Sequence, residues 1–191
     1  MKERIAIFID GRNFYHSIKG LSRRGLSVNF REIIKRLSEN RDLICVFYYN
    51  ALLDKDYDER GYKRHNRFLE VLRSIPKFKV VICDWRKIID ENGCLRYDVK
   101  GDDVRLAHDL LMGAFQNMYD VAVVVSGDAD FIPVINTIRR KFGKRVGNGF
   151  FRRTSSYRLR KSCDFSINMN KLIYELNKKA SAPSGDGTSQ V

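Results

Sequence analysis

Aspartates placed directly after apolar segments are the residues of this chain best suited to chemistry. The run Val121–Val125 predicts a strand buried on both faces, and a Ser-Gly turn after it leads to Asp128 and Asp130. Asp10 follows a second apolar run in the same way. Ligands of open parallel sheets bind outside the carboxyl ends of the strands, so we expect these carboxylates to lie at a ligand site.

A third group of acids opens a helical segment, because Asp102 and Asp103 precede the apolar positions of a predicted helix that also carries Asp109. Two like charges about 4 Å apart repel by roughly 4 kcal/mol at an effective dielectric near 20. Several such pairs would rival the whole stability of a domain, about 5–15 kcal/mol. If these acids converge, protons or a cation must neutralise them. A ligand set of oxygens without histidine or thiolate suits Mg²⁺ or Mn²⁺ rather than zinc.

Each of these acids also has an ordinary structural explanation. Asp128 or Asp130 alone suits a helix cap, Asp103 alone suits the first turn of a helix, and Asp109 alone suits a solvated surface. It is less expected that acids at two strand ends and one helix start each have a separate structural role. We therefore favour a shared site.

Other chemistries lack their motifs. The chain has no GxxxxGK loop, no GxGxxG fingerprint and no GxSxG elbow, and its three histidines share no metal-binding spacing. Its four cysteines form no CxxC pair, which favours reduced thiols in the cytoplasm. No apolar run approaches the roughly 20 residues that span a bilayer, and no signal peptide is apparent, so we expect no membrane contact.

The charge indicates a polyanionic partner. Lys and Arg number 36 against 23 Asp and Glu, a net charge of +13. The segment 139–161 contains ten basic residues and no acid, with Phe150, Phe151 and Tyr157 interleaved. A solvated basic face is the alternative, but basic residues with aromatics near an acidic centre favour nucleic acid.

Alternating strand and helix signals over about 170 residues predict an α/β fold with a parallel sheet covered by helices on both sides. The strands ending at Asp10 and Ser126 are expected to be neighbours at a switch point. We expect one domain over residues 1–179 and a disordered tail over 180–191. Segments 86–90 and 94–99 predict a hairpin, suited to a substrate lid or a dimer contact.

Predicted strands cover 4–9, 43–49, 79–84, 121–125 and 144–151, and predicted helices cover 26–40, 57–74, 154–161 and 170–178 in addition to those after Asn13, Lys100 and Phe131. Asn13 is expected to cap the first helix.

Three blocks of the sequence resemble the signatures of the NYN domain, in the LabA-like branch of the PIN-like nucleases. They are Phe8-Ile-Asp-Gly-Arg-Asn-Phe14, Lys100-Gly-Asp-Asp-Val-Arg-Leu-Ala-His-Asp109 and Val125-Ser-Gly-Asp-Ala-Asp-Phe-Ile-Pro133. The resemblance covers roughly residues 4–175 and implies a three-layer α/β/α, PIN-like or Rossmann-like fold and metal-dependent cleavage of RNA.

The resemblance also implies site residues. Asp10 matches the acid at the end of the family's first strand, and Asn13 matches the residue near it. Asp103 matches the acid that opens the central helix, Asp128 matches the later strand-end acid with Asp130 beside it, and Asp109 matches a further helix acid. Asp102 stands where the family usually has an apolar residue. No residue matches the glutamate that many PIN nucleases supply from an early helix.

The sequence therefore predicts a Mg²⁺- or Mn²⁺-dependent ribonuclease acting on RNA, expected to be single-stranded. Asp10, Asp103 and Asp128 would hold the ion, Asp130 would complete the site or orient water, and Asn13 would bind substrate or ligand. Candidate substrate contacts are Lys100, Arg152, Arg153, Tyr157 and Arg158, and Phe150 or Phe151 could also stack bases.

Two other functions stay open at this point. The first is a non-catalytic RNA-binding or regulatory module that keeps the fold. The second is a phosphatase-like enzyme that uses Asp10 as phosphoryl acceptor, which would leave the basic surface unexplained. Whether the chain forms a homodimer is also open.

Overall fold

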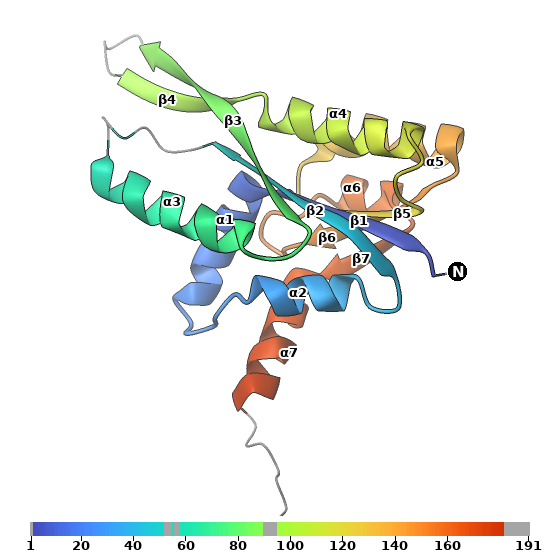
Figure 1. The fold of residues 1–191 in the computed structure, drawn as a ribbon, viewed down its shortest axis with the longest axis horizontal. Helices are drawn as coiled ribbons and strands as arrows, with labels where there is room; N and C mark the ends of the chain where they lie inside the picture. The colour runs from blue at the N-terminus through green and yellow to red at the C-terminus, as the bar shows by residue number, and fades with distance from the viewer. Residues whose placement is uncertain (1, 52–54, 56–57, 90–94, 182–191) are drawn as a thin grey trace, which may run out of the picture.

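A twisted, largely parallel sheet runs through the molecule, with helices on both faces (Figure 1). The computed structural model describes residues 2–51, 55, 58–89 and 95–181. The strands of that part are β1 (Arg4–Asp10), β2 (Asp42–Ala51), β3 (Phe78–Ile89), β4 (Leu95–Lys100), β5 (Val121–Val125), β6 (Arg145–Phe150) and β7 (Phe165–Asn168). Their order is β4-β3-β2-β1-β5-β6-β7, and all pair in parallel except β4, which is antiparallel to β3.

The helices are α1 (Gly11–Ser22), α2 (Phe30–Leu37), α3 (Glu59–Arg73), α4 (Asp102–Phe115), the 3₁₀ turn η1 (Ala129–Phe131), α5 (Ile132–Phe142), α6 (Tyr157–Ser162) and α7 (Met169–Ser181). Helices α1, α2, α3 and α7 contribute to one apolar cluster, and α4, α5 and α6 contribute to another. The two clusters lie on opposite faces, because Ile7 of β1 belongs to the first and its neighbour Phe8 to the second. This arrangement confirms the predicted three-layer α/β/α fold.

The predicted switch point lies between β1 and β5. These strands are direct neighbours in parallel register, with Ile9 opposite Val125. Asp10 and Ser126 therefore leave the sheet side by side, although 116 positions separate them in sequence. The same register explains how the first and third sequence blocks reach one edge.

Several element boundaries differ from the prediction. Strand β3 continues to Ile89 as one strand and pairs with β4 from Asp84↔Lys100 to Ile89↔Leu95, whereas a break near residue 85 was expected. The turn of this predicted hairpin lies outside the described residues. Strand β7 was not predicted, because its alternating apolar and polar residues extend over only four positions.

The ends of three helices also differ. Helix α2 begins later than predicted, because the Asn29 side chain caps it by accepting from two backbone amides. Helix α7 extends to Ser181, past the expected start of the tail at 180, and residues 182–191 lie outside the described part. Asp10, rather than Asn13, caps α1, because the strand passes into the helix without a loop.

Membrane crossing and thiol chemistry can be assessed only for the described residues. None of the helices there is long and apolar enough to cross a bilayer. Cys45, Cys83 and Cys163 are buried and form no disulfide within the described residues, and Cys94 lies outside the described part.

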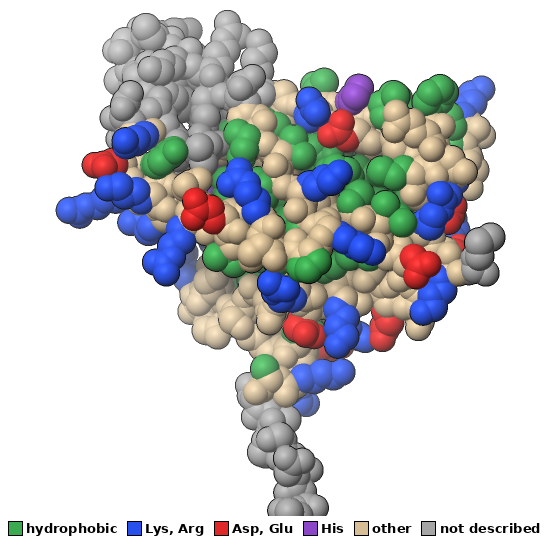
Figure 2. All heavy atoms as spheres, viewed as in Figure 1, with side chains coloured by type: hydrophobic (Ala, Val, Ile, Leu, Met, Phe, Trp, Pro, Cys, Tyr) green, Lys and Arg blue, Asp and Glu red, His purple; other side chains and the backbone are tan. Residues whose placement is uncertain are grey.

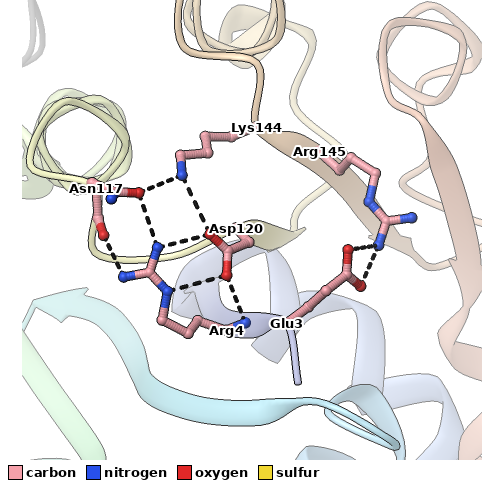
Figure 3. A network of polar contacts seen from close by, with 6 residues as sticks. All are labelled: Glu3, Arg4, Asn117, Asp120, Lys144 and Arg145. Atoms are coloured by element: carbon pink, nitrogen blue, oxygen red, sulfur yellow. Dashed lines mark hydrogen bonds and ion pairs between the residues drawn. The ribbon is translucent and has the colours of Figure 1, made fainter. Parts of the chain in front are cut away.

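A polar network fastens the amino-terminal edge of the sheet, opposite the predicted site (Figure 3). Asp120, just before β5, accepts two hydrogen bonds from the Arg4 guanidinium (2.7 and 3.1 Å) and one from the Arg4 backbone amide (2.9 Å). Lys144, just before β6, lies 3.4 Å from the same carboxylate. These contacts hold the pKa of Asp120 well below its usual range, with the Arg4 side-chain hydrogen bonds as the main cause. The network thus ties together the starts of β1, β5 and β6.

Replacing Asp120 by Asn is expected to lower the free energy of unfolding at pH 7 by about 1–2 kcal/mol, since the variant loses charged hydrogen bonds that are partly screened by solvent. The folded-state pKa is depressed, so this contribution is present above the ordinary carboxylate pKa near 4 and disappears as pH falls below it. Urea unfolding at pH 7 and at a series of values below 4 measures the difference.

Glu3→Gln is the control for this variant. It breaks two outer ion pairs, those of Glu3 with Arg145 and with Arg41. The Glu3 side chain is 47% exposed, and each exposed pair of this kind contributes about 0–1 kcal/mol. An Asp120→Asn effect that is no larger than this control, or that does not shrink at low pH, would contradict the role given to the network.

Candidate functional site

Asp10 occupies a buried position where β1 passes directly into α1. Its residue is 7% exposed, one carboxylate oxygen accepts from the Asn13 backbone amide (2.9 Å), and the other accepts from the Ser126 hydroxyl (2.8 Å). The tight turn requires Gly11, because a Cβ there would lie 2.5 Å from the Tyr49 carbonyl oxygen. The Asp10 carboxylate is therefore fixed in position by both strands of the switch point.

Ser126 connects the two acidic strand ends. Its hydroxyl donates to Asp10 and accepts from the Asp128 backbone amide (3.1 Å). Its carbonyl oxygen accepts from the buried side-chain amide of Asn148 on β6 (2.9 Å). Asp128 in turn caps η1 by accepting from the Asp130 backbone amide (2.9 Å). Asp10 and Asp128 thus both cap helices, an ordinary structural role. Both also line the same cavity.

The third pair of acids begins α4, after Gly101 in the left-handed conformation (φ 86°). Asp102 is buried and Asp103 is more exposed. Both line one cavity of about 280 Å³, which we call the carboxylate cavity. Its lining residues are Asp10, Arg12, Asn13, His16, Asp102, Asp103, Asp128 and Thr154.

Burial and mutual repulsion perturb these acids. Burial raises the pKa of Asp103 to about 6, with the charges of Asp102, Asp10 and Asp128 adding to the rise and Arg12 opposing it. Burial also raises the pKa of Asp10, although the hydrogen bonds from Asn13 and Ser126 offset part of the effect. A site in which ionised carboxylates are disfavoured gains stability from a bound proton or cation.

The donor set of the carboxylate cavity suits a hard cation such as Mg²⁺ or Mn²⁺, because its acidic ligands are all oxygens. Within the described residues, however, no three acidic, imidazole or thiol side chains already converge as a complete ligand set. A cation would therefore need water ligands or side-chain rotation, as is common for Mg²⁺.

Two predicted acids do not line this cavity. Asp130 is exposed on η1 and contributes only its backbone amide to Asp128. Asp109 lies two turns along α4, where it accepts from the Tyr49 hydroxyl and from Arg105 (3.2 Å each) and contacts the His108 ring (3.0 Å). Helical geometry separates both carboxylates from the strand ends.

The predicted substrate contacts fall into different places. Arg152 and Arg153 line a second cavity, whereas Tyr157 and Arg158 lie on α6. Lys100 is the last residue of β4, and its side chain lies outside the described part.

The aromatic residues of the basic segment also differ in their surroundings. Phe151 is only 2% exposed and packs edge-on against Phe14 (centroids 5.4 Å apart), so its expected role in stacking a base is wrong. Arg160 covers the Phe150 ring at 4.6 Å. Tyr157 is 64% exposed.

Basic side chains also lie outside the segment 139–161, since that segment contains ten of the 36 Lys and Arg residues. Lys and Arg side chains are scattered over the face shown in Figure 2, with acidic side chains between them.

Thr154, His16 and Arg12 are cavity residues that sequence reasoning missed. The Thr154 hydroxyl donates to the Asn13 side-chain oxygen (3.3 Å) across 141 positions. A Cβ on Gly127 would overlap the Thr154 carbonyl oxygen, so the glycine of the Ser-Gly turn permits this approach. Arg12 and His16 had a weak signal, because both follow Asp10 within two turns of α1.

Comparison with known proteins gives two findings. A model of the family described as NYN domain matches residues 4–170. The crystal structure of VPA0982, a protein of unknown function from Vibrio parahaemolyticus RIMD 2210633, has a TM-score of 0.71 and 23% identity, with 90% of this chain and 95% of that chain covered. At this identity the likeness concerns the fold alone. No curated protein matches the chain.

Replacing Asp103 by Asn is expected to raise the melting temperature at pH 8 and to have much less effect at pH 4. The pKa of Asp103 is raised to about 6 in the folded protein, so the ionised carboxyl destabilises the fold once pH rises through that value. Thermal unfolding in EDTA, which removes divalent ions, measures the shift.

Asp130→Asn is the matched control, since it removes an exposed acid outside the carboxylate cavity. Equal shifts for both variants, or a shift for Asp103→Asn that is independent of pH, would argue against mutual repulsion of the acids.

Proposed function

The chain belongs to the NYN domain family, and from that premise we propose that it is a metal-dependent ribonuclease. NYN domains are generally nucleases. The observation that carries the proposal is the carboxylate cavity, in which Asp10, the Asp102-Asp103 pair and Asp128 meet from three distant segments of the chain. The three sequence blocks support assignment to the LabA-like branch.

Asp10, Asp103 and Asp128 are the proposed ligands of Mg²⁺ or Mn²⁺, partly through water, and the structure adds Asp102 as a fourth candidate. A bound ion would lower the pKa of a water molecule and stabilise charge on the phosphate. The protein's own task is to hold the carboxylates close together and in fixed positions. Ser126 does this for Asp10, and the Asp130 backbone amide does it for Asp128.

Asn13 is the proposed substrate contact inside the cavity. Its side-chain oxygen is engaged by the Thr154 hydroxyl, which orients the amide nitrogen as a donor available to a phosphate oxygen. Arg12 adds positive charge at the same wall. Together they would orient an anionic substrate beside the acids.

The substrate is proposed to be RNA, expected to be single-stranded, because the net charge of +13 favours a polyanionic partner. The lack of a disulfide among the buried cysteines of the described part supports a cytoplasmic location.

A non-catalytic RNA-binding module is the second candidate. One observation favours it: the described residues hold no ready-made set of three metal ligands. A phosphoryl-acceptor role for Asp10 is less consistent with the structure, because both of its oxygens already accept hydrogen bonds. Incubation of a short single-stranded RNA with the protein in Mn²⁺ and in EDTA separates the enzyme from the module.

Asp128→Asn is expected to reduce Mn²⁺-dependent cleavage by about a hundredfold or more, because it removes a charged ligand, while RNA affinity in EDTA stays within a few-fold of the wild type. Gel analysis of labelled RNA and fluorescence anisotropy provide the two measurements. Asp109→Asn is the matched control, since it removes the same charge from α4 outside the carboxylate cavity. Full activity of Asp128→Asn, or equal loss in both variants, would exclude the assigned role of Asp128.

A further inference from the structure

A second and larger cavity lies between α1, the segment after β6 and the start of α7. Its volume is about 460 Å³, within the range of about 300–1,000 Å³ typical of small-molecule sites. We call it the basic cavity, because the side chains of Arg24, Arg152, Arg153 and Lys171 line it, and no acidic residue does.

The charges of the basic cavity are largely uncompensated. Within the described part of the chain, Arg24, Arg152 and Arg153 form no ion pair with an acid. Lys171 has one loose contact, 3.8 Å from Glu175, on a side chain that is 76% exposed. Like charges gathered without counter-charges repel one another, so an anion would stabilise this arrangement.

The remaining wall is apolar and aromatic. Leu21 and Phe151 are buried at the cavity, and the Tyr174 side chain at its edge is 60% exposed. A small inorganic anion would use none of this surface. A nucleotide would use both parts, since its phosphate contacts the cations and its base can stack on an aromatic ring.

The basic cavity adjoins the carboxylate cavity. Ser17 lines the first and Thr154 lines the second, and their hydroxyls are hydrogen-bonded at 2.9 Å. The loop that carries Arg152 and Arg153 is held in place at one end, because the Arg152 backbone amide donates to the Asn170 side chain (2.9 Å). A nucleic-acid strand bound at the carboxylate cavity would therefore extend directly into the basic cavity.

We propose that the basic cavity binds a nucleotide of the RNA strand that flanks the phosphodiester held at the carboxylate cavity. Arg152 and Arg153 contact its backbone phosphate, and Tyr174 stacks on its base. This inference rests on the proposed function for the identity of the ligand, but it concerns binding and not cleavage.

The test compares affinities for a fluorescently labelled single-stranded RNA in EDTA, where no metal-dependent cleavage occurs. The double variant Arg152→Gln/Arg153→Gln is expected to weaken binding and to reduce the slope of log affinity against log salt by about 0.7 for each phosphate that the two arginines neutralise in the wild type. Tyr174→Leu is expected to weaken binding by about 5- to 150-fold with an unchanged salt slope, the range equivalent to removal of one stacked base.

The matched control is Lys178→Gln/Lys179→Gln, which removes the same charge from exposed positions in the last turn of α7, outside the cavity lining. It should retain most of the affinity. Equal losses in the two double variants would overturn the proposal in favour of a diffuse charge effect. Melting temperatures within a few degrees of the wild type would show that all variants fold.

Photocrosslinking with RNA that contains 5-bromouracil locates the base directly. A cross-linked peptide containing Tyr174 supports the proposal, and cross-links confined to other faces overturn it. Competition adds a further discrimination: a nucleoside monophosphate should displace RNA at lower concentration than inorganic phosphate, whereas equal potency would mean a simple anion site. If the protein bound RNA at Tyr174 but never cleaved it in Mn²⁺, the proposed ribonuclease would fail while this site would stand.

Discussion

The hydrogen bond from the Ser126 hydroxyl to Asp10 is the interaction on which the rest of the site depends. It joins the ends of two strands that are distant in sequence, and it opposes the rise that burial causes in the pKa of the Asp10 carboxyl. The same hydroxyl accepts from the Asp128 amide, so one side chain sets the positions of two acids. Asn148 supports it from β6 by holding the Ser126 carbonyl oxygen.

The two ends of β1 and β5 differ in their electrostatics, because acids repel one another at the carboxyl ends whereas charges are paired at the amino ends. At the carboxyl edge, burial and then the neighbouring acids raise the pKa of Asp103 and disfavour its ionised form. At the amino edge, Arg4, Asp120 and Lys144 form a compensated network (Figure 3). Since β1 and β5 pair in parallel throughout, fixing one end of the strands fixes the other.

The sequence predicted most reliably the parts with strong local signals. The strands β1 and β5 are uninterrupted apolar runs because both faces are buried, and the acids at their ends were recognised together. Long-range packing carried no such signal: Thr154 reaches Asn13 only because Gly127 lets a distant loop approach. Phe151 looked like a surface aromatic among basic residues, yet it directly follows β6 and is buried against Phe14.

Single acids were harder to assign than the site as a whole. Asp10 proved to be both a cap and a cavity residue, because no loop separates β1 from α1. Asp109 had a plausible position in the motif, but only the structure shows it engaged with Tyr49 and Arg105. The spacing of residues along a helix predicts the face on which each side chain lies. Whether that side chain reaches the ligand site depends on how far along the helix it lies from the carboxyl ends of the strands.

The most direct test of the central claim is an anomalous diffraction experiment on crystals soaked in Mn²⁺. We predict an anomalous peak inside the carboxylate cavity, with Asp10, Asp128 and at least one of Asp102 and Asp103 as direct or water-mediated ligands. A well-ordered cavity without such a peak at millimolar Mn²⁺, with Asp10 and Asp128 still bound only as caps, would contradict the account.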